Sequence, residues 1–330
     1  MTLHRLTSVT MGVPNVAETA AYYTDFGLQP AEAAPGGTGD SGGSGDSGGS
    51  GDSGGEVWFS TRDGGRQLRI VPAPTRRLVD LHVGVDDEDD LDRVAASLSR
   101  LGIGTERGPG WISAVEKVTG TRAYLEIAER LAQDTVAPTP YNGPGRTERP
   151  GTRAPGILRD GPVAPRKLGH AVLGSTDPQA TEAFFVSGLG FKISDRIKGA
   201  GTFMRCSTDH HNVLVLGAPV SFLHHTSWQV DDVDEVGRGA HAMLEDHPER
   251  HVWGLGRHYG GSNFFWYLKD PAGNFSEYYS DMDCIVDDQL WTPEDLEGAR
   301  GLFSWGPPPP PSFIHPDDLA AMMTGAHAAR

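Results

Sequence analysis

One strand–turn–helix pattern occurs four times along the chain, and it limits the folds that are possible. Each copy is an apolar run, then an Asp or Asn at a helix start, then a helix-like segment; the copies are residues 6–28, 78–103, 168–191 and 223–244. Asp and Asn are favoured there because their side chains accept hydrogen bonds from free backbone N–H groups. Strand-like runs such as EVWFSTRDG and NFFWYLK follow the helices. The repetition predicts an α+β fold of four tandem βαβββ modules, paired into two domains with curled mixed sheets and helices outside.

Three irregular stretches divide the chain. Residues 36–55 repeat the motif GDSGGS, and such a composition predicts a disordered surface loop. Residues 136–166 are rich in Pro and Gly without an apolar period, which predicts a linker. We therefore expect one domain over 1–135, a second over 167–285 and a proline-rich arm over 286–330. The five consecutive prolines of the arm predict a polyproline II segment, laid across its own domain or a neighbouring subunit with Trp305 and Phe313 as anchors.

Charge and composition exclude several classes of partner. The net charge is −16 and basic residues are not concentrated anywhere, so nucleic acid and anionic membranes are not expected as partners. The sequence shows neither a run of about 20 apolar residues nor an apolar signal core at its start. Cys206 and Cys284 are the two cysteines and lie far apart in the sequence, which suits a reducing cytoplasm rather than a disulfide framework.

A carboxylate stands inside the aromatic stretch RHYGGSNFFWYLKDPAGNFSEYY, residues 257–279. The sequence DPAGN is a strong turn signal, and a symmetric hairpin around Ala272 places Tyr267 opposite Glu277. Opposed residues of an antiparallel pair point to the same face, so Glu277 shares an aromatic face with Tyr267, Phe265 and Tyr279. A buried carboxylate is costly unless it is paired or binds a metal.

Two histidine-containing strands offer partners for Glu277. His170 lies in the first strand of the third module, and the pair His224–His225 lies in the first strand of the fourth. Pairing of these two strands brings His170 close to one histidine of the pair, since strand alternation lets only one of the two face the pocket. Two neutral imidazoles and one carboxylate form a facial triad, which suits Fe(II) and leaves the other coordination positions open.

The C-terminal half resembles the type I extradiol ring-cleavage dioxygenases of the vicinal oxygen chelate superfamily. The resemblance rests on Gly256-Arg257-His258, the nine-residue step to Tyr267, and the further ten residues to Glu277 after an Asp-Pro-x-Gly turn. It also rests on the histidine pair in CSTDHHNVLVL, residues 206–216. These motifs cover about 165–285, whereas the resemblance extends to 1–135 only as module architecture.

The resemblance implies a role for each of these residues. It favours His225 over His224, so that the metal ligands are His170, His225 and Glu277. It also favours His211 over His210 as the acid/base. A histidine suits this role because a side chain of near-neutral pKa can both take and give a proton. His258 and Tyr267 are expected to hydrogen-bond the oxygens of the substrate.

The activity implied is Fe(II)-dependent extradiol (meta) cleavage of a catechol-type diol with O2, in aromatic catabolism, with Mn(II) fitting the same ligands. The corresponding positions of the first half are Ser8 and Asp80, so that half is expected to be a metal-free structural domain. A cytoplasmic homo-oligomer is also implied. Two alternatives stay open: a glyoxalase-like metal isomerase, which would need ligands from both halves, and a non-catalytic ligand-binding protein, which needs no metal triad.

Overall fold

The structure is a computed structural model, and it describes residues 3–32 and 55–328, with side chains up to residue 325. The Gly-Ser-Asp repeat predicted to be a disordered loop lies outside the described residues, apart from its last glycine. The described elements follow the order strand, helix, three strands, four times over. The first half comprises β1 (Leu3–Val13), α1 (Val16–Asp25), β2 (Gln29–Ala31), β3 (Val57–Thr61), β4 (Gly65–Pro72), β5 (Arg77–Val85), α2 (Glu88–Arg100), β6 (Glu106–Gly108), β7 (Trp111–Val115) and β8 (Arg122–Ile127).

The second half repeats this order and adds a tail. Its modules comprise β9 (Lys167–Ser175), α3 (Pro178–Ala183) with a π-helical turn (Phe184–Leu189), β10 (Lys192–Ile197), β11 (Gly201–Arg205), β12 (Val213–Gly217), β13 (Phe222–Gln229), α4 (Val233–Leu244), β14 (His251–Arg257), β15 (Phe264–Lys269) and β16 (Phe275–Ser280). The tail contains β17 (Asp295–Leu296), α5 (Pro311–Ile314) and α6 (Leu319–Ala328).

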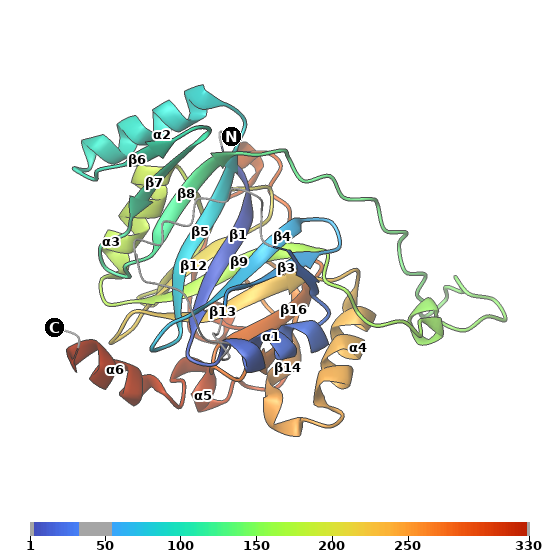
Figure 1. Cartoon of the computed structure of the whole chain (residues 1–330). Helices are drawn as coiled ribbons and strands as arrows, with labels where there is room; N and C mark the ends of the chain where they lie inside the picture. The colour runs from blue at the N-terminus through green and yellow to red at the C-terminus, as the bar shows by residue number, and fades with distance from the viewer. Residues whose placement is uncertain (1–2, 33–54, 329–330) are drawn as a thin grey trace.

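Each half forms one mixed sheet, as the α+β prediction required. The first sheet has the strand order β2-β3-β4-β1-β5-β8-β7-β6, and the second has the order β14-β15-β16-β13-β9-β12-β11-β10-β17. The first strands of two modules pair antiparallel at the centre of each sheet, β1 with β5 and β9 with β13. Helices α2, α3 and α4 lie on the outside of the sheets (Figure 1). The pairing of β9 with β13 confirms that the two histidine-bearing strands are neighbours.

The two halves share one hydrophobic core, which holds residues of both central strand pairs. Helix α1 of the first half reaches the second sheet, where the ring of Phe26 stacks on Tyr278 of β16 with 3.9 Å between centroids. The Tyr278 hydroxyl also donates a hydrogen bond of 2.7 Å to the Phe26 carbonyl. Because side chains alternate along a strand, the residue before Tyr278 points to the opposite face of the sheet. The packing of the first half therefore helps to fix Glu277 on the face away from this core.

The hairpin of β15 and β16 has the predicted register. Tyr267 pairs with Glu277, and Lys269 pairs with Phe275. The turn is closed by the backbone N–H of Asp270, which donates to the Asn274 carbonyl at 2.9 Å. The Asp270 carboxylate in turn accepts from the Asn274 N–H at 2.9 Å. The strong turn signal thus sets which residues of the two strands share a face.

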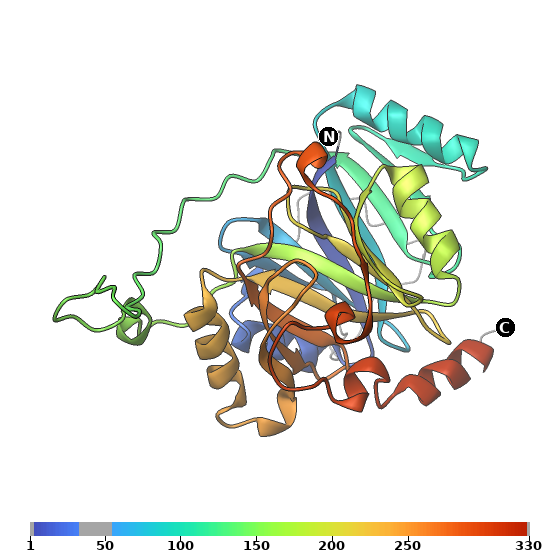
Figure 2. The same cartoon turned by 180° about the vertical axis from the view of Figure 1, so that it is seen from behind.

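Two segments lie outside the modules. Residues 128–166 contain no strand of either sheet; the segment loops out from the body of the molecule and then returns to it (Figure 1), where Val163 is buried in the core. Arg159 within it binds Asp232 at the start of α4 at 2.6 Å. The tail crosses the second sheet (Figure 2), with β17 pairing to β10. Phe313 of the tail is buried, whereas Trp305 is 47% exposed. Within the described ranges, no helix is long and apolar enough to cross a membrane.

Candidate active site

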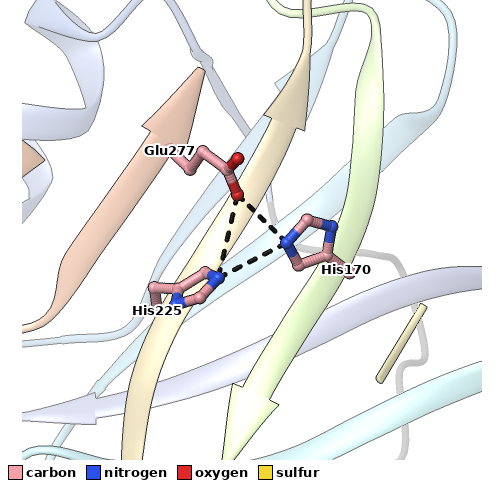
Figure 3. Close-up of side chains that lie close together, drawn as sticks. All are labelled: His170, His225 and Glu277. Carbon is pink, nitrogen blue, oxygen red and sulfur yellow. Dashed lines mark hydrogen bonds and ion pairs between the residues drawn. The ribbon is translucent and has the colours of Figure 1, made fainter. Parts of the chain in front are cut away.

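His170, His225 and Glu277 converge from three neighbouring strands, β9, β13 and β16 (Figure 3). Nε2 of His170 lies 3.0 Å from Oε2 of Glu277 and 3.4 Å from Nε2 of His225. Nε2 of His225 lies 3.7 Å from the same carboxylate oxygen. All three side chains are buried. In the described part of the chain, this is the one group of three or more His, Cys, Asp or Glu side chains with metal-binding proximity.

These three atoms fit a single divalent cation. Nitrogen and oxygen ligands stand about 2.0–2.2 Å from a transition metal, so one ion can touch any two atoms less than about 4 Å apart. All three separations satisfy this limit. Oε1 of Glu277 accepts from the Asn263 side chain at 3.1 Å, whereas no hydrogen bond reaches Oε2, the oxygen that faces both imidazoles. A fully buried carboxylate oxygen that is left free between two imidazoles is the arrangement a metal site requires.

The charge states also suit metal binding. Burial raises the pKa of Glu277, but the neighbouring His170 and His258 outweigh burial and hold the pKa below its usual value. Burial, and then the neighbouring His224, lower the pKa of His225 well below its ordinary value. The site therefore offers a carboxylate and a neutral imidazole, which are the protonation states that ligate metals.

His211 faces the same cavity as His170, and their ring centroids lie 4.1 Å apart. His210 does not line the cavity; instead its Nδ1 lies 3.1 Å from Nδ1 of His211, and its Nε2 lies 3.0 Å from the Asp195 carboxylate. Because Asp195 accepts the His210 Nε2–H, the bare Nδ1 of a neutral His210 accepts from His211. That arrangement leaves Nε2 of His211 unprotonated. Burial, followed by His170 and His210, lowers the pKa of His211 well below its usual value, so the near-neutral pKa expected from sequence is not found and the imidazole is neutral before substrate binds.

His258 and Tyr267 form a second polar pair in the cavity wall. Nδ1 of His258 donates to the carbonyl of Leu302 in the tail, and its Nε2 accepts from the Tyr267 hydroxyl at 2.9 Å. Burial, and then the charge of Glu277, raise the pKa of Tyr267 well above its usual value. Tyr267 therefore stays protonated and remains a hydrogen-bond donor.

His224 and His225 both line the cavity, so the expectation that only one of them faces it is wrong. The reason is an irregularity in β13: the register against β9 shifts between Leu223 and His225, which leaves His224 as an extra residue. His225 points its Nε2 to the ligand group, whereas His224 turns to the tail, where its Nε2 lies 2.6 Å from the carbonyl of Phe313.

The cavity has a volume of about 300 Å³ and is mostly apolar. The second sheet and the tail share its wall, and the tail contributes Leu302, Phe313, Ile314, His315 and Leu319 among others. The ring of Phe313 lies 4.7 Å from that of Tyr267. The sequence predicted that the tail lies across a domain but did not locate it over this cavity. It also did not identify Asp195 as the partner of His210 in the pair His210–His211.

The matching positions of the first half have different chemistry. Ser8 pairs opposite His82 as His170 pairs opposite Ser227, and Thr10 pairs opposite Asp80 as Val172 pairs opposite His225. Ser8 and Asp80 are therefore the register equivalents of the two histidines, as predicted from sequence. The equivalent of Glu277, by its position opposite His82 on β8, is Tyr124.

Comparison with known proteins identifies the superfamily of the second half. Residues 167–278 match the family model of the Glyoxalase/Bleomycin resistance protein/Dioxygenase superfamily, so the second half carries a domain of that superfamily. The relatives of the chain within it are named as extradiol dioxygenases, which confirms the resemblance seen in the sequence motifs. Metapyrocatechase 2 of Cupriavidus necator is 36% identical over 197 residues, which are 59% of this chain and 60% of that protein.

Other relatives carry different metals in their names. A manganese-dependent 2,3-dihydroxybiphenyl 1,2-dioxygenase of Geobacillus genomosp. 3 is 29% identical over 157 residues, 44% of this chain and 50% of that protein. An iron-dependent extradiol dioxygenase of Rhodococcus jostii is 28% identical over 154 residues, 42% of this chain and 50% of that protein. The chain thus spans about half to three fifths of the length of these relatives.

Solved structures share the whole fold. A halotolerant catechol dioxygenase superposes with a TM-score of 0.69 at 18% identity and covers 96% of both chains. A Mn(II)-bound glyoxalase from Novosphingobium aromaticivorans superposes with a TM-score of 0.67 at 24% identity, covering 93% of this chain and 95% of that one. At these identities the likeness establishes the fold, and the activity has to be argued from the site.

Proposed function

We propose that this chain is an Fe(II)-dependent extradiol dioxygenase, which opens the ring of a catechol-type diol beside its two hydroxyl groups and inserts both atoms of O2. The observation that carries the proposal is the triangle of His170, His225 and Glu277, buried beside a mostly apolar cavity. The names of the matched relatives support the same activity. An enzyme with this activity would act in the catabolism of aromatic compounds.

In this proposal His170, His225 and Glu277 hold the metal. When bound, Fe(II) would supply the positive charge that lets a diol bind ionised and the redox chemistry with O2. Three protein ligands on one side of the metal leave its other coordination positions open for the diol and O2, so a fourth protein ligand would compete with them. Mn(II) fits the same donors, and the names of two relatives show one metal each.

The remaining polar residues handle protons and orient the diol. His211 has an unprotonated Nε2 in the tautomer set by His210 and Asp195, so it is the general base for a diol proton. Once protonated, the same nitrogen can return the proton when the ring opens. The Tyr267 hydroxyl gives its proton to Nε2 of His258, which leaves the Tyr267 oxygen free to accept a hydrogen bond from a diol hydroxyl, so the pair orients the oxygens of the diol. The apolar walls around them exclude water.

The test is anaerobic reconstitution of the purified full chain with Fe(II), followed by addition of catechols and air. We expect O2 uptake with an equal amount of yellow ring-opened product. Glu277→Ala should abolish uptake and lose stoichiometric iron, whereas Glu126→Ala, which removes a carboxylate from β8 of the first half, should keep both. Bound iron without O2 uptake across mono- and bicyclic catechols would refute the dioxygenase and favour an isomerase. Absence of bound metal would favour a ligand-binding protein.

A further inference from the structure

The hydrogen bonds of His224 define the tautomer of His225. A carbonyl oxygen only accepts, so the 2.6 Å contact to the Phe313 carbonyl requires a proton on Nε2 of His224. His224 is buried among aromatic rings, including Phe275 and Phe313, without a carboxylate among its hydrogen-bond partners, so it is neutral there and its Nδ1 is bare. The 2.7 Å contact between the two Nδ1 atoms then requires that His225 donates.

This assignment leaves the Nε2 of His225 with a free lone pair directed at His170 and Glu277. We infer that His224 is a positioning residue that fixes His225 in its metal-binding tautomer and joins it to the C-terminal tail. The inference rests on the proposed function, because it takes His225 to be a ligand. Partners of this kind orient metal-ligating histidines, and their loss typically lowers metal affinity about 10–100-fold.

The tail is held at this point by contacts that do not depend on His224. The indole N–H of Trp253 donates to the Pro307 carbonyl at 2.7 Å, and Arg76 binds Asp318 at 2.6 Å. The ring of Phe313 also packs on Trp253 with 4.8 Å between centroids. The Phe313 carbonyl is therefore a fixed acceptor, and the docked tail takes part in orienting the ligand.

The test compares two variants of His224 by equilibrium Mn(II) binding in competition with a chelator, which needs no turnover. His224→Leu removes both hydrogen bonds and should weaken Mn(II) binding by 10–100-fold. His224→Gln keeps one acceptor and one donor and should stay within about threefold of the wild type. Equal losses in the two variants, or wild-type affinity in His224→Leu, would overturn the inference. A wild type that binds no Mn(II) would overturn the proposed function as well.

A second measurement needs no substitution. In metal-free protein labelled with ¹⁵N-histidine, long-range proton–nitrogen spectra report which ring nitrogen carries the proton. We expect His224 protonated at Nε2 and His225 protonated at Nδ1, with the signals assigned through His224→Gln. The opposite tautomer of His225, with the proton on Nε2, would refute the relay even if the leucine variant fails to fold.

An independent observation, the chemistry of the cavity wall, narrows the substrate class. In the part of the chain that the structure describes, the wall contains no Lys, Arg, Asp or Glu. Five of its six histidines belong to the networks described above, and the sixth, His315, is exposed on the tail. Apolar side chains from both the second sheet and the tail line much of the rest, among them Ile197, Leu214, Leu216, Leu302, Phe313 and Leu319.

A single-ring catechol leaves much of the 300 Å³ unfilled, since it has the volume of roughly four to five waters at about 30 Å³ each. An apolar substituent would fill the remainder and gain from burial. A carboxylate substituent would be buried without a cation to pair with. We infer that the preferred substrates are uncharged catechols with an apolar substituent, such as an aryl or alkyl group, and that catechols with a carboxylate are rejected. This inference also rests on the proposed function.

The test is kcat/KM of the Fe(II)-loaded chain for catechol, 3-phenylcatechol and 3,4-dihydroxybenzoate. We expect 3-phenylcatechol to exceed catechol at least tenfold, and the carboxylated compound to fall at least 100-fold below catechol. Leu216→Arg places a cation at a half-buried wall position and should raise the relative value for 3,4-dihydroxybenzoate at least tenfold, while Leu216→Gln should not.

Turnover of catechols with the reverse ranking would overturn this inference while leaving the dioxygenase intact. An unchanged ranking in Leu216→Arg, with an active Leu216→Gln, would also overturn it, because the substituent would then lie elsewhere. Absence of turnover with all three compounds would instead refute the proposed function.

Discussion

Arg76 connects the first half of the chain to the tail that covers the cavity, and its replacement by Met provides a sharp test of how that tail is held. The guanidinium is buried, with Nε 2.6 Å from one Asp318 oxygen and an Nη 2.9 Å from the other. Its second Nη donates to the carbonyl of Leu223, beside His224 in β13. The group also lies over the ring of Phe222 at 5.2 Å.

The expected loss in free energy of unfolding follows from the interactions that Asp318, the Leu223 carbonyl and Phe222 lose when the guanidinium is removed. Asp318 is 38% exposed and regains water, so its share is small. The Leu223 carbonyl loses a charge-assisted hydrogen bond in a buried place, which costs about 1–3 kcal/mol, and lost packing on Phe222 adds about 1 kcal/mol. Arg76→Met should therefore destabilise by about 3 kcal/mol, or lower Tm by roughly 6 °C at about 2 °C per kcal/mol for a chain of this size.

The assay is thermal unfolding of the full chain with limited proteolysis of the tail as a second readout. Arg77→Met is the matched control, since Arg77 is exposed and makes one long contact of 3.5 Å to the Gly120 carbonyl. We expect the control to unfold within about 1 °C of the wild type and to keep its tail protected. Equal Tm values for Arg76→Met and the wild type, with an equally protected tail, would refute the reasoning.

Three further outcomes follow from the structure. Burial lowers the pKa of His82, but Asp80 and Glu126 outweigh burial and raise it to about 9. Since this folded pKa lies above the unfolded value of about 6.5, the stabilisation is complete below about pH 6.5 and is lost as pH rises towards 9. Urea unfolding should therefore show a fall of about 3 kcal/mol across this window in the wild type, since a pKa raised from about 6.5 to about 9 corresponds to roughly that free energy, and His82→Gln should lack this fall; parallel profiles would contradict it. His211→Gln should lower kcat by about 10²–10⁴-fold in O2 uptake while full metal content is kept, and near-normal turnover would exclude the acid/base role. Tyr267→Phe should raise KM for catechol about tenfold, the value of one hydrogen bond, and an unchanged KM in steady-state assays would remove Tyr267 from diol binding.

The parts of the site that could be predicted from sequence are those that local rules determine. The turn DPAGN fixes the hairpin register, and the register alone places Glu277 opposite Tyr267. The repeat of modules identifies β9 and β13 as neighbours, which brings His170 and His225 together. Both inferences follow from spacing within one hairpin or from the order of elements within one repeat. They therefore do not depend on knowing how the loops and the tail pack.

The parts that sequence could not give depend on irregular geometry or on distant contacts. Strand alternation excluded one histidine of the pair His224–His225, but the bulge in β13 lets both line the cavity. The carbonyl that His224 meets belongs to Phe313, 89 residues further along the chain. Asp195, which orients His210, likewise comes from a separate strand. The motifs mark the residues of the proposed metal site and its cavity wall, whereas the residues that hold them in place emerge only from packing.

The convergence of three side chains on one cation is tested most directly by anomalous X-ray diffraction at the iron edge from crystals of the anaerobically Fe(II)-loaded chain. The structure predicts one anomalous peak about 2.0–2.3 Å from Nε2 of His170, Nε2 of His225 and an oxygen of Glu277. A peak bound to other residues, or fully loaded crystals without a peak between these three side chains, would contradict the account.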